Sequence, residues 1–175
     1  MTEGKTKTLK KVKGGRIPHN LTEVNGIKFH SKMESKYYKE ILEKMENKTV
    51  TDKGVIVNIE LQPEFLLQEK FIIIDGKAIF ESHPDFNRLK RKHEAKTIRA
   101  IKYKSDFKIT YDTGEVRIVD TKGKSTADFE LKRKIFMAKY PDLKLDVVTE
   151  YKGHWVNYYQ HELDKKKKKD KKEKK

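Results

Sequence analysis

Three charged side chains in the middle of the chain have the types and spacing that phosphate chemistry needs. Asp106 lies in one predicted strand, and Asp120 and Lys122 lie in the next, within the run VDTKG. If a three-residue loop at 112–114 joins the two strands, Asp106 falls directly opposite Asp120; a two-residue loop shifts the pairing by one residue. Like charges opposite each other destabilise a strand pair, so their juxtaposition favours a cation between them.

The cation that fits this pair is a hard one. Two carboxylates and a strand carbonyl, here that of Thr121, supply the oxygen ligands that Mg²⁺ or Mn²⁺ prefers. Such an ion can hold a phosphate oxygen, activate water and stabilise a leaving oxyanion. Lys122 shares strand parity with Asp120, so its charge would lie beside the phosphorus. The simpler interpretation is an ordinary cross-strand charge cluster on a solvated sheet face.

A fourth candidate, Glu34, lies on a predicted helix at about residues 32–47. Ser31 is a plausible N-cap, and Glu34 follows it at the capping-box spacing. On a helical wheel Glu34 points along the middle of the apolar face, where an unpaired carboxylate is costly. It could complete the ligand set or position the water, or it could merely close a capping box. Gln62, at the end of the following strand, is either a further active-site group or a hydrogen-bonded strand-end amide.

Alternating apolar residues and turn signals predict the elements that position these side chains. The predicted strands are 55–62, 71–74, 77–80, 98–111, 115–121 and 143–148, with a helix at 126–140 and a marginal C-terminal helix at 151–159. A strand that follows a helix normally lies parallel to its predecessor through a right-handed crossover. The order therefore predicts an α/β fold with a central mixed sheet flanked by helices.

The charge of the chain is unevenly distributed. Lys and Arg number 42 against 27 Asp and Glu, a net charge of +15. Nine lysines and two acids give residues 165–175 a charge of +7, and six basic residues and one Glu give residues 1–16 a charge of +5. Such runs cannot bury apolar surface, so both are expected to be disordered. A folded domain is expected at 17–149, followed by an extension at 150–164.

The composition also excludes several classes of protein. The chain has no cysteine, which excludes disulfides, thiolate metal sites and cysteine nucleophiles. It also has no apolar run long enough to span a membrane and no apolar signal-peptide core. We therefore expect a soluble, cytoplasmic protein without a membrane partner.

Residues 83–104 carry a charge of +6 and lead into the strand of Asp106. This segment predicts a basic wall beside the metal that binds DNA phosphates in a salt-dependent way. Each cation could equally belong to an ordinary solvated face. Four aromatic residues at 151–159 could stack on unpaired bases or pack on the domain. The candidate DNA-binding residues are Arg88, Lys90, Arg91, Lys92, Lys96, Arg99, Lys102, Lys104 and Lys124.

Taken in order, these residues resemble the PD-(D/E)XK nuclease superfamily. A closer likeness, over about residues 16–149, is to a small phage-encoded branch of that superfamily, and nucleases of similar layout include Holliday junction resolvases. One departure is Ser105, which stands where the superfamily has proline before the first aspartate. The motifs that carry the likeness are Gly26–Glu34, Glu60–Phe65, Tyr103–Phe107 and Asp120–Gly123.

The resemblance implies a restriction-endonuclease-like core of order αβββαβ and Mg²⁺-dependent hydrolysis of DNA, with Mn²⁺ as a substitute. It implies Asp106 and Asp120 as metal ligands, Glu34 as ligand or water positioner, and Lys122 as the catalytic lysine. We therefore expect a phage or prophage endonuclease that acts on branched DNA in the bacterial cytoplasm. Symmetric cutting of a junction would require a homodimer. The alternatives are a nuclease for ordinary duplex or single-stranded DNA in phage replication or packaging, and a non-catalytic DNA-binding protein.

Overall fold

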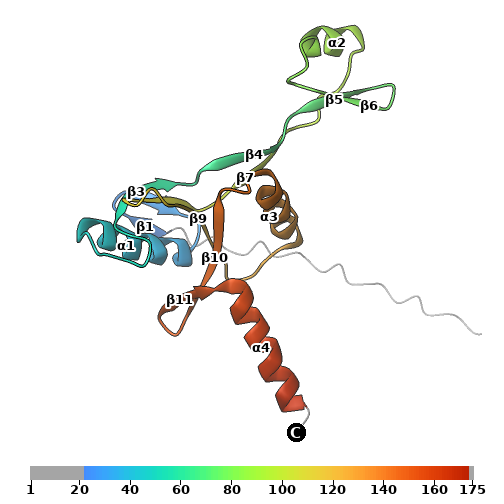
Figure 1. The fold of residues 1–175 in the computed structure, drawn as a ribbon. Coiled ribbons are helices and arrows are strands. Elements are labelled where there is room, and N and C mark those ends of the chain that lie inside the picture. The colour runs from blue at the N-terminus through green and yellow to red at the C-terminus, as the bar shows by residue number, and fades with distance from the viewer. Residues whose placement is uncertain (1–21, 174–175) are drawn as a thin grey trace, which may run out of the picture.

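The computed structural model describes residues 22–173, and their body is an α/β unit around a five-stranded mixed sheet (Figure 1). The strand order is β11-β10-β9-β8-β3, in which β9 and β10 are parallel and the other neighbours antiparallel. The mixed sheet is therefore confirmed. The strands are β3 (Ile56–Leu61), β8 (Phe107–Tyr111), β9 (Val116–Thr121), β10 (Lys144–Tyr151) and β11 (His154–Asn157).

Two helices cover opposite faces of this sheet. Helix α1 (Lys32–Glu46) packs Tyr38 and Ile41 against Phe107 and other residues of β8, and helix α3 (Ala127–Lys139) packs against Ile118 and its neighbours on the other face. Both helices begin where the sequence predicts. The Ser31 hydroxyl accepts a hydrogen bond from the Glu34 N–H at 3.0 Å, and that of Thr126 accepts from the Phe129 N–H at 3.2 Å.

The predicted register of the hairpin formed by β8 and β9 is confirmed. Phe107 pairs with Val119, and the Tyr111 N–H donates to the Glu115 carbonyl at 2.9 Å. Gly114 has φ of +83°, the left-handed conformation that a three-residue loop needs. One residue beyond the end of this ladder, Asp106 falls opposite Asp120.

The segment before β8 differs from the prediction. Residues 98–111 do not form one strand, because β7 (Ile101–Lys104) leaves the sheet and pairs with β4 (Glu64–Gln68). Beyond this ribbon the chain forms the hairpin β5 (Phe71–Ile74) and β6 (Lys77–Phe80), which is confirmed, and helix α2 (Phe86–Lys92), which was not expected. Together residues 64–104 form an arm, whose ribbon of β4 and β7 packs against α3 on the body and whose tip, residues 69–100, projects beyond it (Figure 1).

A hairpin at the start of the described residues was also missed. Strands β1 (Thr22–Val24) and β2 (Ile27–Phe29) pair antiparallel, and Val24 and Phe29 join the core beneath α1. The turn residues Asn25 and Gly26 have φ of +51° and +77°, the conformation for which Asn-Gly is strongly favoured. The predicted N-terminal arm at 1–16 lies outside the described residues.

The C-terminal segment differs from the expected helix over 151–159. Positive φ at Lys152 and Gly153 reverses the chain, so 154–157 form strand β11 against β10. Helix α4 (Tyr158–Glu173) follows and continues through most of the Lys-rich run for which disorder was expected. Tyr158 is buried in the core and so anchors the first turn, and lysine extends an existing helix at little cost. None of the helices within 22–173 has the length and apolar character needed to cross a membrane.

Candidate functional site

The predicted residues meet where β8 and β9 end and the arm leaves the body. Asp120 of β9 is only 1 % exposed. Its Oδ2 accepts a hydrogen bond from the Tyr103 hydroxyl at 2.8 Å, and its Oδ1 is paired with the Lys122 ammonium. Burial, followed by the nearby charge of Asp106, raises the pKa of Asp120 from 3.8 to about 6, although Lys122 and Tyr103 act to lower it. Burial and the charge of Asp106 together therefore outweigh the stabilisation of the charged carboxylate by Lys122 and Tyr103.

Asp106 is held by the backbone and side chain of the neighbouring strand. Its Oδ2 accepts hydrogen bonds from the Thr121 N–H at 2.7 Å and from the Thr121 hydroxyl at 2.8 Å. Its own carbonyl accepts from the Gln62 N–H at 2.9 Å. Gln62 has φ of +51°, a conformation that is strained for a residue with a side chain. Asp106 is thus fixed between the strand of Asp120 and the turn that leads into the arm.

Glu34 approaches Asp106 from the first turn of α1. The Ser31 half of the predicted capping box is formed, but the Glu34 carboxylate accepts its hydrogen bond from the His30 N–H, at 3.3 Å. Glu34 is partly buried, and burial followed by the charge of Asp106 raises its pKa. Asp106 therefore lies within the electrostatic influence of both Asp120 and Glu34.

The site consists of two adjoining hollows rather than one. A hollow of about 140 Å³ contains Glu34, Gln62 and Asp106, and a second of about 400 Å³ contains Asp120 and Lys122 at the start of α3. Lys104 borders both hollows. Within the described residues, no three His, Cys, Asp or Glu side chains converge as a ready-made metal cluster. The five predicted side chains therefore border one hollow or the other, but the three carboxylates do not share one hollow.

Sequence reasoning missed two residues of the site. Tyr103, 2 % exposed, is the hydrogen-bond donor to Asp120; its contribution depends on the ribbon formed by β4 and β7, which local pattern did not predict. Ser105, 1 % exposed, borders the smaller hollow, and its hydroxyl has no hydrogen-bond partner among residues 22–173. Its position before Asp106 was the only sequence signal.

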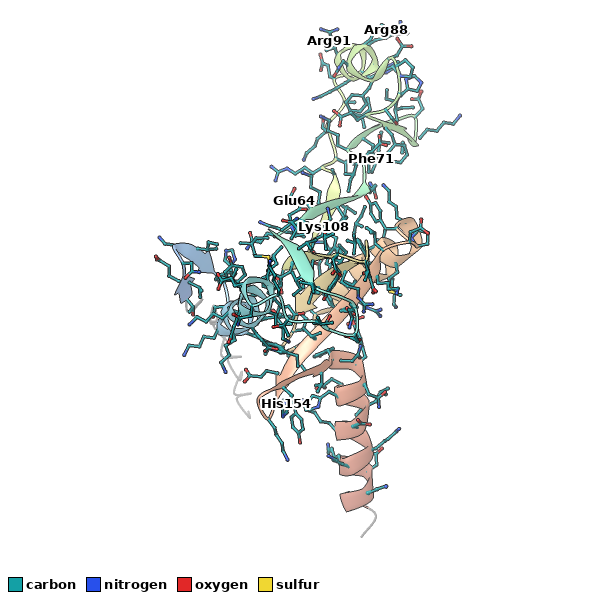
Figure 2. All side chains as sticks on the ribbon, turned by 60° about the vertical axis from the view of Figure 1, so that its left-hand side comes forward. Glu64, Phe71, Arg88, Arg91, Lys108 and His154 are labelled. Atoms are coloured by element: carbon teal, nitrogen blue, oxygen red, sulfur yellow. The ribbon has the colours of Figure 1, made fainter. Side chains whose placement is uncertain are left out.

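The predicted basic wall is only partly present at the site. Lys102, Lys104 and Lys124 line the larger hollow. The other six cations of the predicted wall precede β7, in the tip of the arm, and Figure 2 shows Arg88 and Arg91 there, away from the body. The expectation that the whole segment lies beside the site is therefore wrong, because β7 turns out of the sheet before it reaches Asp106. The predicted cations that line neither hollow are Arg88, Lys90, Arg91, Lys92, Lys96 and Arg99.

The aromatic residues after β10 mostly pack on the domain. The Trp155 indole N–H donates to Glu40 at 2.7 Å, and its ring meets Tyr37 edge-on at 4.8 Å. Tyr158 is buried, and the Tyr159 hydroxyl donates to Glu130 at 2.8 Å. Trp155, Tyr158 and Tyr159 therefore pack on the domain, which is the second of the two roles that the sequence left open for them.

Comparison with known proteins places the chain in a family but gives it no characterised relative. The family described as "Protein of unknown function (DUF1064)" matches residues 19–154. Searches of the curated proteins and of the solved structures found no match. Because the family match covers well over half of the sequence, this chain belongs to the DUF1064 family.

Proposed function

We propose that the protein is a Mg²⁺-dependent DNA endonuclease that hydrolyses phosphodiester bonds beside Asp106, Asp120 and Lys122. The observation that carries the proposal is the geometry at the ends of β8 and β9, where buried Asp120 lies opposite Asp106 and is paired with Lys122. Two carboxylates placed opposite each other on a strand pair are destabilising, and one of them is buried here. One bound cation would relieve this arrangement.

The donors present fit a hard divalent cation. All of them are oxygens: the carboxylate of Asp120 in the larger hollow, the carboxylates of Asp106 and Glu34 in the smaller one, and the carbonyl of Thr121 at the end of β9. Bound there, Mg²⁺ or Mn²⁺ would neutralise the phosphate and lower the pKa of the attacking water. Asp106 and Asp120 are the proposed principal ligands, because they face each other across neighbouring strands.

The surrounding side chains orient this chemistry. Tyr103 donates a hydrogen bond to one oxygen of Asp120, and Thr121 donates to one oxygen of Asp106. Both carboxylates are therefore oriented before the reaction begins. The Lys122 ammonium would turn from Asp120 to the scissile phosphate and stabilise its developing charge. Glu34, with its raised pKa, is suited to accept a proton from the attacking water, and Gln62 would hold the substrate or that water.

The proposed substrate is branched DNA, on the likeness of layout to Holliday junction resolvases, and the proposed setting is phage recombination in a bacterial cytoplasm. A homodimer would supply the two active sites that symmetric junction cleavage needs. The test compares a four-way junction with duplex and single-stranded DNA of the same sequence, each with Mg²⁺ or with EDTA.

Cleavage of the junction in Mg²⁺, its absence in EDTA, and its loss in Lys122→Ala are the expected results. Lys39→Ala, an exposed lysine on α1, is the matched control and should cut normally. Binding of DNA without cleavage of any substrate would instead support the non-catalytic DNA-binding alternative. Equal cleavage of all three substrates would support a nuclease for ordinary DNA.

A further inference from the structure

The tip of the arm, residues 69–100, is an ordered unit with its own small core. Ile72 is fully buried and Phe86 is 4 % exposed, although neither belongs to the two hydrophobic clusters of the body. Phe71 and Ile98 exchange backbone hydrogen bonds of 3.1 and 2.7 Å across the base of the tip. The tip therefore has a defined surface at a distance from the body (Figure 2).

Both roots of the arm adjoin the candidate site. Strand β4 begins two residues after Gln62, and β7 ends two residues before Asp106. Lys104, the last residue of β7, borders both hollows of the site. A ligand bound along the arm would therefore extend from the tip to the proposed scissile phosphate.

The tip carries a group of cations that its own structure leaves unneutralised. Other basic residues of the arm pair with acids, namely Lys70 with Glu81, Arg88 with Asp85 and Lys102 with Glu64. Helix α2 has no acidic residue, and its last turn is basic, which the helix dipole favours by only about 0.3–1 kcal/mol per charge. The exposed cations of the tip without an ion-pair partner among the described residues are Lys77, Lys90, Arg91, Lys92, Lys96 and Arg99.

We propose that the arm is a clamp for the DNA backbone, whose tip binds the phosphates of a duplex segment remote from the scissile bond. This inference rests on the proposed function, since it takes DNA as the substrate. The lysines that line the larger hollow can contact phosphates only at the site, whereas the cations of α2 lie at the tip, away from the body (Figure 2), and can contact only phosphates remote from it. A regularly spaced polyanion neutralises the adjacent cations of α2, which otherwise repel one another.

The expected effect follows from counterion release. Each phosphate contact contributes about 0.9 to the slope of log K against log salt for duplex DNA, so loss of three contacts lowers that slope by about 2.7. Fluorescence anisotropy with the full chain in EDTA measures binding to a duplex and to a junction without cleavage. The variant is Lys90→Gln/Arg91→Gln/Lys92→Gln, which we expect to lose at least tenfold in affinity at about 0.15 M salt.

The matched control removes the same charge from a different surface. Lys28→Gln/Lys39→Gln/Lys48→Gln takes three exposed lysines from β2, α1 and the turn after α1. This control should keep a slope within about 0.5 of the original. An unchanged slope in the arm variant, or an equal reduction in both variants, would overturn the proposal.

A second measurement does not depend on removing charge. The chain has no cysteine, so Asn87→Cys on α2 can carry a single photo-crosslinker, with Glu43→Cys on α1 as control. Crosslinks to DNA are expected from the first site and not from the second; their absence from Asn87 would count against the clamp. If the α2 position crosslinks to DNA and binding depends on salt, but no DNA is cleaved, the nuclease proposal is overturned and the clamp proposal stands. Cleavage with an unchanged slope would overturn the clamp alone.

Discussion

Replacement of Asp120 by asparagine should stabilise the metal-free protein while it abolishes cleavage. Asp120 is almost fully buried, and its pKa in the folded protein is about 6 against 3.8 for the free side chain. A difference of about two pKa units corresponds to roughly 3 kcal/mol that favours the neutral form. Asparagine is neutral and keeps an oxygen for the Tyr103 hydroxyl. We expect the free energy of unfolding at about pH 8 to rise by about 1–3 kcal/mol.

The pH dependence of this gain has a definite sign. Because folding raises the pKa of Asp120, its favourable contribution is complete below about pH 3.8 and is lost as pH rises through about 6. The Asp120→Asn variant should therefore match the original protein near pH 4 and exceed it in stability above about pH 7. Chemical unfolding in EDTA across this range measures the difference.

The control for this measurement is Asp142→Asn, which changes an exposed carboxylate and should shift stability by less than about 0.5 kcal/mol at any pH. A lower stability of Asp120→Asn than of the original protein at pH about 8 would contradict this expectation. That result would mean that Asp120 and Lys122 form a stabilising structural ion pair with no unneutralised charge.

Three further predictions concern the same site and the tail. Mg²⁺ at about ten times its dissociation constant should stabilise the original protein by about 1.4 kcal/mol, measured as a rise of a few degrees in unfolding temperature. Asp120→Asn should show no such rise, and equal rises in both proteins would contradict Asp120 as a ligand. Tyr103→Phe should lower the free energy of unfolding in urea by about 1–3 kcal/mol, because it removes the hydrogen-bond donor to buried Asp120. The loss should be smaller when Asp120 is already asparagine, and equal losses in the two backgrounds would show that the two side chains are not coupled. Deletion of residues 165–175 should weaken DNA binding and its salt dependence yet leave cleavage at saturating protein, so lost cleavage would place this segment in the active assembly.

The parts of the fold set by local chemistry were predictable. Ser31 and Thr126 cap helices at the expected positions, and Gly114 supplies the left-handed residue of the β8–β9 loop. That loop fixes the register, and the register brings Asp106 opposite Asp120. The crossover through α3 makes β10 parallel to β9, as chain order alone requires.

The parts set by distant contacts were not predictable. Residues 98–111 have a continuous strand-like pattern, and only pairing with β4 shows that β7 belongs to the arm. That one departure moves the basic residues of α2 away from the site and brings Tyr103 to Asp120. At the C-terminus, the turn at Gly153 and the burial of Tyr158 determine where α4 begins, and neither depends on helical periodicity.

The central claim is that the carboxylate pair and Lys122 form a metal-dependent nuclease site. Its most direct test is single-turnover cleavage of a four-way junction in Mg²⁺ by Asp106→Asn, Asp120→Asn and Lys122→Ala, with Glu34→Gln compared against Glu43→Gln on the exposed side of α1. We predict loss of cleavage in all four site variants, with junction binding retained and the Glu43→Gln control active. Cleavage that persists in Asp120→Asn, or that proceeds equally in EDTA, would contradict the assignment.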